Sequence, residues 1–197
     1  MTYKQLFVRS YARSASNFIV NNVAVINPKM IIHKSPWWKI DKEVENSVVI
    51  SVLRNPKDVI VSDIAMGLQD KKYSKEDLEQ IDHSKSIEDF KKYMLLMVDN
   101  IENIVPFTFE QITENPKKSF SIFLNYCGYK EDFIFPDVKV EKMLRFNYAQ
   151  NKNMYVFPTS KDLSSYDILY NSISGLDELI NIYEESRYAI YKRQLDF

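Results

Sequence analysis

The segment Val48 to Leu53, with the sequence VVISVL, places the strongest constraint on the fold of this chain. Its residues are almost all apolar and mostly β-branched, which is typical of a strand buried on both faces of a sheet. Helix-start signals follow at once, because Asn55 suits an N-cap, Pro56 the first helical position and Asp58 the third. A buried strand that leads directly into a helix predicts a mainly parallel sheet with helices on its faces.

Strands and helices alternate along the rest of the chain. Short apolar runs predict three more strands, at 6–9, 30–33 and 105–109. Apolar residues at helical spacing and capping signals predict helices at about 18–26, 56–66, 74–104 with a break near residue 83, 115–127 and 176–194. This order predicts one α/β domain over residues 1–197, with a central parallel sheet flanked by helices and ligand sites at the carboxyl ends of the strands.

The composition excludes several classes of function. A formal net charge of −1 over 197 residues provides no general attraction to nucleic acid or to anionic lipid. No apolar run is long enough to cross a membrane, and the N-terminus lacks the apolar core of a signal peptide. Cys127 is the only cysteine, which excludes an internal disulfide and a cysteine-based metal cluster. We therefore expect a soluble cytoplasmic protein that binds neither nucleic acid nor membrane.

Two residues beside the helix that starts at Pro56 indicate a ligand. Capping alone explains the residues of the helix start. It requires neither Arg54 at the strand exit nor Ser62 about two turns into the helix, and both side chains can face the same loop region. A planar guanidinium group and a hydroxyl group provide directional contacts to a phosphate dianion. This pair therefore predicts a phosphate site.

The segment VVISVLRNPKDVIVS resembles the 3′-phosphate-binding strand, loop and helix of sulfotransferases that use PAPS, 3′-phosphoadenosine 5′-phosphosulfate. The resemblance implies a P-loop-like α/β fold, with Arg54 and Ser62 as ligands of the 3′-phosphate. Upstream, YARSASNF resembles the 5′-phosphosulfate loop of the family. Such a strand-to-helix loop directs backbone N–H groups and the positive end of the helix dipole at an anion. The implied loop residues are Arg13, Ser14, Ala15, Ser16 and Asn17.

The chain departs from the family pattern at several positions. A surface arginine beside a simple serine N-cap is the alternative for the upstream loop. Ala15 stands where the family generally has glycine, so a positive φ there would strain the loop.

Phe109, in a segment that resembles a later strand and helix, replaces a tyrosine and is expected to stack near the adenine or to fill core. The family's C-terminal Arg-Lys-Gly segment has no match, which leaves Arg145 and Lys152 as candidate substitutes. The resemblance covers about residues 6–129.

The resemblance also implies metal-free transfer of a sulfuryl group from PAPS to a hydroxyl or amine of a small molecule, glycan or peptide. Arg13 and the loop amides would stabilise the charge on the transferring and leaving groups. Many cytosolic members carry the base in a Lys-Thr-His-Leu-Pro pattern, and here the chain reads Ile-His-Lys-Ser-Pro over residues 32–36. Aligned prolines put Lys34 at the histidine position, and a shift of one residue reverses the side-chain face. His33 is the candidate base, or a strand-end histidine without a role, and Lys34 is a candidate contact to the transferring group.

Alternatives remain at the level of function. A catalytically silent sulfotransferase-fold protein that binds a nucleotide or takes part in an assembly, for example a viral one, is favoured by Ala15, Phe109, the shifted His33 and the missing C-terminal basic segment. The presence of Arg13, Arg54 and Ser62 favours the active enzyme. An unrelated α/β phosphate-binding domain is the third interpretation. The absence of GxxxxGK[ST] disfavours an ATPase or a kinase. Trp37 and Trp38 suit either an acceptor pocket for a sugar or a ring, or an aromatic core under a loop.

Overall fold

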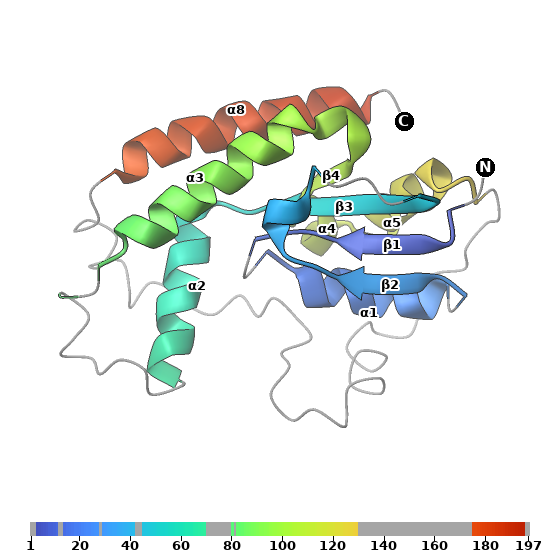
Figure 1. Ribbon diagram of the computed structural model, residues 1–197, viewed down its shortest axis with the longest axis horizontal. Coiled ribbons are helices and arrows are strands. Elements are labelled where there is room, and N and C mark those ends of the chain that lie inside the picture. Colours follow the sequence, from blue (N-terminus) through green and yellow to red (C-terminus); the bar gives the residue numbers. More distant parts are fainter. Residues whose placement is uncertain are drawn as a thin grey trace.

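The computed structural model describes residues 3–11, 14–27, 29–41, 45–69, 80, 82–129 and 175–195. Its sheet has four parallel strands in the order β2-β1-β3-β4 (Figure 1). The strands are β1 (Gln5–Val8), β2 (Ile31–Lys34), β3 (Ser47–Leu53) and β4 (Val105–Thr108). The predicted α/β class, with a central parallel sheet flanked by helices, is therefore confirmed.

Helices cover both faces of this sheet (Figure 1). One face packs against α1 (Ser16–Ile26) and α5 (Pro116–Tyr126), and the other against α3 (Ser84–Asp99) and α8 (Leu176–Gln194). The helix α2 (Pro56–Gln69) leaves the carboxyl end of β3 on the α3 side. The short elements are α4 (Phe109–Glu114), η1 (Trp37–Lys39) and η3 (Ile101–Asn103).

The strand β3 is the centre of the core, as its sequence predicts. Val48, Ile50 and Val52 are buried on the α1 side, while Val49 and Leu53 are buried on the α3 side. Because side chains alternate along a strand, only a strand covered on both faces can bury every position in this way. The nearly continuous apolar run is thus a consequence of packing on two faces.

Several predicted boundaries were wrong by one residue or more. The strand expected at 6–9 begins and ends one residue earlier, and the strand expected at 30–33 lies one residue later at both ends. The strand expected at 105–109 ends at Thr108, because Thr108 and Gln111 form a capping box that starts α4 at Phe109. The sequence analysis missed this helix.

The long helix expected at 74–104 was also predicted wrongly at its C-terminal end. Residues 70–79 lie outside the described residues, and α3 begins at Ser84, directly after the predicted break near residue 83. It ends at Asp99 and is followed by the single turn η3. The predicted C-terminal helix at 176–194 is confirmed as α8.

The strand order creates a switch point between β1 and β3. After β1 the chain runs through α1 to β2 on one side, and after β3 it runs through α2 and α3 to β4 on the other. The two loops therefore leave the same edge of the sheet in opposite directions. Ligands of open α/β sheets bind in the crevice at such a point, outside the carboxyl ends of the strands.

Hydroxyl groups of Ser10, Ser51 and Tyr93 join β1 and β3 at this edge, and those of Ser51 and Tyr93 are buried. The Ser51 hydroxyl donates to the Arg9 carbonyl at 2.9 Å, and the Val52 backbone N–H donates to Ser10 Oγ at 2.9 Å. The Tyr93 hydroxyl of α3 donates to the Val52 carbonyl at 2.7 Å, and its oxygen lies 2.9 Å from Ser51 Oγ. Burial raises the pKa of Tyr93 well above its ordinary value, so the hydroxyl stays protonated and able to donate.

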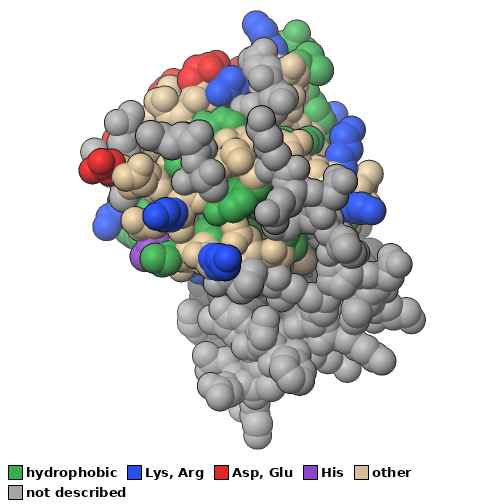
Figure 2. All heavy atoms as spheres, turned by 90° about the vertical axis from the view of Figure 1, so that its right-hand side faces the viewer, with side chains coloured by type: hydrophobic (Ala, Val, Ile, Leu, Met, Phe, Trp, Pro, Cys, Tyr) green, Lys and Arg blue, Asp and Glu red, His purple; other side chains and the backbone are tan. Residues whose placement is uncertain are grey.

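The opposite, amino edge faces the viewer in Figure 2. Over the described part of this face, basic and acidic side chains are scattered among apolar and neutral polar ones and gather into no patch of one sign. Among the described helices, none is both long enough and apolar enough to span a membrane.

We expect Tyr93→Phe to lower the free energy of unfolding by about 1–3 kcal/mol, because the buried Val52 carbonyl loses its side-chain donor. Urea denaturation followed by circular dichroism measures this change. Tyr188→Phe is the matched control, since Tyr188 is exposed on the outer face of α8, and its effect should stay below about 0.5 kcal/mol. Equal effects of the two substitutions would contradict a stabilising role for the buried hydroxyl group.

Candidate functional site

The carboxyl edge of the sheet brings the predicted site residues together from four segments. The loop of Ser14 and Ala15 follows β1, His33 and Lys34 end β2, Arg54 follows β3, and Phe109 follows β4. Parallel strands end at the same edge, which explains why segments distant in sequence meet here. Three predicted residues, Arg13, Arg145 and Lys152, lie outside the described residues.

Ser14 is the most unusual polar residue at this edge. It is 0% exposed, and its Oγ has no hydrogen-bond partner within the part of the chain that the structure describes. Its backbone N–H donates to the Tyr11 carbonyl at 3.3 Å, which folds the loop back on itself. A buried hydroxyl without a partner costs about 1–3 kcal/mol. This cost is removed if a ligand oxygen accepts the hydroxyl hydrogen.

Ala15 adopts a left-handed conformation, with φ of 58° and ψ of 18°. The sequence analysis predicted strain for this case, and for a residue with a Cβ atom the conformation costs about 1–2 kcal/mol. Ala15 is also the N-cap of α1 and offers no side-chain oxygen to the first turn, which starts at Ser16 and includes Asn17. No acidic residue lies in that turn. Its backbone N–H groups and the helix dipole therefore favour an anion at this end.

Arg54 lies against the aromatic ring of Phe109. The guanidinium carbon is 4.2 Å from the ring centroid, within the range of a cation–π contact. Both residues are half-buried, and each follows the end of its strand, β3 for Arg54 and β4 for Phe109. The ring therefore packs against one side of the guanidinium group. A phenylalanine makes this contact without the hydroxyl group of a tyrosine.

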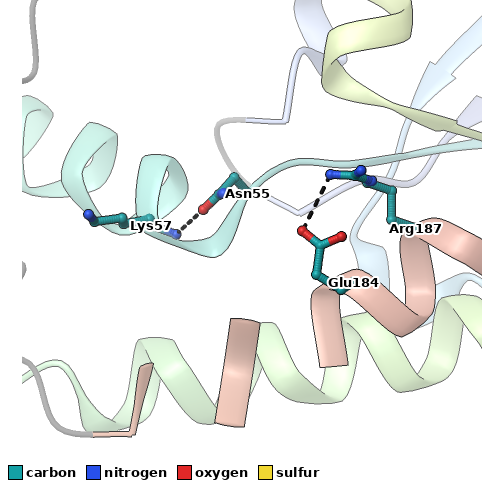
Figure 3. Close-up of polar contacts among 4 residues, drawn as sticks. All are labelled: Asn55, Lys57, Glu184 and Arg187. Atoms are coloured by element: carbon teal, nitrogen blue, oxygen red, sulfur yellow. Dashed lines mark hydrogen bonds and ion pairs between the residues drawn. The ribbon is translucent and has the colours of Figure 1, made fainter. Parts of the chain in front are cut away.

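The start of α2 has the predicted cap. Asn55 Oδ1 accepts the backbone N–H of Lys57 at 2.9 Å, and Asp58 lies in the first turn (Figure 3). Ser62 lies in the same helix and is half-buried. In Figure 3 the Arg187 side chain extends from α8 toward the turn that carries Asn55.

Arg187, on α8, is a basic residue that the sequence analysis did not single out. It forms an ion pair with Glu184, at 3.3 Å from Nη1 to Oε1 (Figure 3). The i,i+3 pair is common on helix surfaces. The helix α8 packs against α2 and β4, and no local pattern in the sequence predicts that packing.

His33 and Lys34 face opposite sides of the sheet. The His33 ring stacks on Phe7, with centroids 4.6 Å apart and planes 17° apart, and Phe7 packs on the α3 side. Lys34 pairs in register with Val8, which is buried on the α1 side, and Lys34 itself is exposed. Neighbouring residues on paired strands share a face. Lys34 is therefore on the side of the Ser14 loop, and His33 is on the other.

The two tryptophans differ in exposure. Trp37 packs on Tyr11 and Tyr93, with ring centroids 5.9 Å and 6.0 Å apart, as expected for an aromatic core. Trp38 is 59% exposed and makes an edge contact with Trp37. Of the two, Trp38 is therefore the one available to a ligand.

A pocket of about 50 Å³ lies beside this edge, between α2 and α3. Tyr11, Asp63, Asp82 and His83 contribute polar groups to its wall. Burial lowers the pKa of His83, and the charges of Asp82 and Asp63 oppose this shift. The pocket is large enough for ordered water beside these polar groups.

We expect Ala15→Gly to raise the free energy of unfolding by about 0.5–1 kcal/mol, because relief of the left-handed strain exceeds the added entropy of the unfolded chain. Chemical denaturation measures the change. Ala24→Gly, in the interior of the same helix, is the control and should lower the stability by about 1 kcal/mol. Destabilisation of similar size at both positions would show that Ala15 is not strained.

A comparison with protein-family models matches residues 14–168 to a family described as sulfotransferase domain. The matched region includes the Ser14 loop, the turn at Arg54 and Phe109, and it extends further toward the C-terminus than the predicted resemblance. A search of the curated proteins found no match. Because the family model covers well over half of the chain, this protein belongs to the sulfotransferase family.

Proposed function

We propose that this protein binds PAPS at the carboxyl edge and transfers its sulfuryl group to a hydroxyl or amine of a small molecule, glycan or peptide. In this reaction the acceptor oxygen or nitrogen forms a bond to sulfur, and the bond from sulfur to the 5′-phosphate oxygen breaks. Adenosine 3′,5′-bisphosphate leaves, and the acceptor loses its proton to a base. Membership of the sulfotransferase family supports this reaction class.

The buried hydroxyl of Ser14 beside the uncapped start of α1 is the observation that carries the proposal. Ser14 Oγ and the N–H groups of Ser16 and Asn17 would donate to oxygens of the 5′-phosphosulfate. Arg13, which the resemblance adds to this loop, would balance negative charge on the leaving phosphate. An anion here would satisfy the hydroxyl group and the helix terminus together, which no described side chain does.

Arg54 and Ser62 are the proposed ligands of the 3′-phosphate. The guanidinium carbon of Arg54 lies 4.2 Å from the centroid of the Phe109 ring, and a guanidinium group can donate two parallel hydrogen bonds to a phosphate. In this assignment Phe109 orients a ligand residue and does not need to contact the adenine itself. The 5′ and 3′ groups of one nucleotide would then lie on either side of the β1–β3 switch point.

For proton transfer and for contact with the sulfuryl group, His33 and Lys34 are alternatives. Lys34 is on the same side of the sheet as the Ser14 loop, so we assign it the contact with the transferring group. His33, the predicted base, stacks on Phe7 on the opposite side. A base role for His33 therefore requires an acceptor that approaches from the α3 side.

A catalytically silent nucleotide-binding protein is the second candidate. The stacked position of His33 on the α3 side favours it, because His33 is the predicted base and has no part in the proposed nucleotide contacts. It requires the same nucleotide contacts at Ser14 and Arg54. Binding and turnover must therefore be measured separately.

Calorimetric titration with adenosine 3′,5′-bisphosphate tests the binding site. Arg54→Ala should weaken binding by more than about tenfold, since a charged hydrogen-bonded contact is lost. Ser14→Ala should weaken binding several-fold while the unliganded protein becomes equally or more stable, since a buried hydroxyl without a partner is removed. Weaker binding together with equal or higher stability is expected only of a hydroxyl group that donates to the ligand.

Two substitutions away from the edge serve as matched controls in the titration. Arg193→Ala removes an arginine that pairs with Glu102 before β4, and Ser121→Ala removes a hydroxyl on the exposed side of α5. Both should leave the affinity within about twofold of the unaltered protein. Failure of the folded, unaltered protein to bind the nucleotide would refute the site.

Release of adenosine 3′,5′-bisphosphate from PAPS, measured with a panel of phenols, amines and sugars, tests catalysis. Lys34→Ala should slow turnover by about tenfold or more with little change in nucleotide affinity, as expected for a group that acts in the transition state. His33→Gln should have a smaller effect. A larger loss for His33→Gln would reverse the two roles, and no turnover with a bound nucleotide would favour the silent protein.

A further inference from the structure

Arg9 is a buried arginine at the carboxyl end of β1, with an exposed fraction of 2%. Its Nε donates to Ser35 Oγ at 3.1 Å, and its Nη1 donates to the Lys39 carbonyl. Its backbone N–H donates to the Ile50 carbonyl at 3.0 Å, and its carbonyl accepts from Ser51. One residue therefore connects β3 with the segment that follows β2, across the full width of β1.

Burying a guanidinium group costs desolvation free energy, so it contributes little net stability to a fold. Burial lowers the pKa of Arg9 below its ordinary value, and the charge of Asp41 opposes this shift. Apolar side chains of similar volume often replace buried charged groups with no loss of stability. A costly polar residue beside a functional edge suggests that its contacts, and not its contribution to folding, explain its presence.

The contacts of Arg9 lead to both candidate residues of β2. Ser35, which it holds, directly follows Lys34, and the Ser35 N–H donates to the Val8 carbonyl at 3.2 Å. The Arg9 guanidinium carbon lies 4.8 Å from the centroid of the Phe7 ring. The same ring stacks on His33 at 4.6 Å. Arg9 thus contacts the ring on which His33 stacks and the residue that directly follows Lys34.

The segment held by Arg9 also reaches the loop before α1. The bond to the Lys39 carbonyl fixes η1, whose Trp37 packs on Tyr11 at 5.9 Å. Tyr11 in turn accepts the N–H of Ser14 at its carbonyl. Ring packing and one backbone hydrogen bond thus connect the segment after β2 with the loop that carries Ser14.

We propose that Arg9 is a positioning residue that holds the end of β2, with His33 and Lys34, in register with the nucleotide loops at the ends of β1 and β3. The proposal rests on the proposed function for its catalytic consequence. Its structural consequence stands alone, because the position of His33 on Phe7 is measurable without any ligand. Arg9 itself need not touch PAPS or the acceptor.

The test compares Arg9→Met, which keeps the length and removes both donors, with Arg9→Lys, which can reach only one acceptor. Arg193→Met is the matched control, because Arg193 has a side chain only 15% exposed and also donates to a backbone carbonyl, that of Glu102. His33 is followed by NMR of its ring protons, which the Phe7 ring shifts. The chain has only two histidines, so His83→Gln assigns the signals.

Arg9→Met should move the His33 ring signals and lower kcat with PAPS by more than about tenfold. The affinity for adenosine 3′,5′-bisphosphate should stay within about threefold, because the proposed ligands keep their backbone supports. Arg9→Lys should give changes in the His33 signals and in kcat that lie between those of the unaltered protein and Arg9→Met. Arg193→Met should change neither the signals nor kcat. Unmoved His33 signals in folded Arg9→Met would overturn the proposal.

The test also covers a variant that does not fold and an unaltered protein that does not bind the nucleotide. If Arg9→Met does not fold, Ser35→Ala removes only the partner of Nε and should move the His33 signals in the same direction by a smaller amount. If the unaltered protein binds no nucleotide, the proposed function fails, but the NMR comparison still decides whether Arg9 holds β2. A change in melting temperature with unmoved signals and unchanged kcat would identify a purely structural arginine.

Discussion

The hydrogen-bonded contact between the carboxyl ends of β1 and β3 is the constraint on which the rest of the structure depends. It replaces part of a regular strand ladder with serine and tyrosine hydroxyl groups, of which Tyr93 comes from α3. The loops toward Ser14 and Arg54 begin within a few residues of this contact. Because the Ser51 and Tyr93 hydroxyl groups are buried and each donates to a backbone carbonyl, they hold the two loop starts together.

The loop before α1 contains two energetically unfavourable features. Ala15 has a left-handed backbone, and Ser14 buries a hydroxyl group without a partner among the described residues. Each costs of the order of 1–3 kcal/mol, and such costs are usually retained where they serve a ligand or a reaction. The surrounding structure can hold this geometry because the loop ends in α1, whose inner face is buried against the sheet.

Some features of the site depend on residues that are close in the sequence, and others depend on residues that are far apart. The cap of α2 at Asn55 and the cap of α5 at Asn115 follow from a side chain and a backbone group two or three residues apart, so sequence patterns predict them. The capping box of Thr108 was equally local and was overlooked because the preceding apolar run appeared to continue through Phe109. The contact between Phe109 and Arg54 joins two strands and has no local signal.

The sequence by itself determined the buried strand β3, the helix starts and the loops rich in anion donors, because these depend on interactions within a few residues. The tertiary structure decided which side of the sheet His33 and Lys34 face, since that depends on the register of β2 against β1. It also decided the partners of Arg9 and the left-handed backbone of Ala15. These features arise only when separate segments pack together, and no single segment carries enough information to specify them.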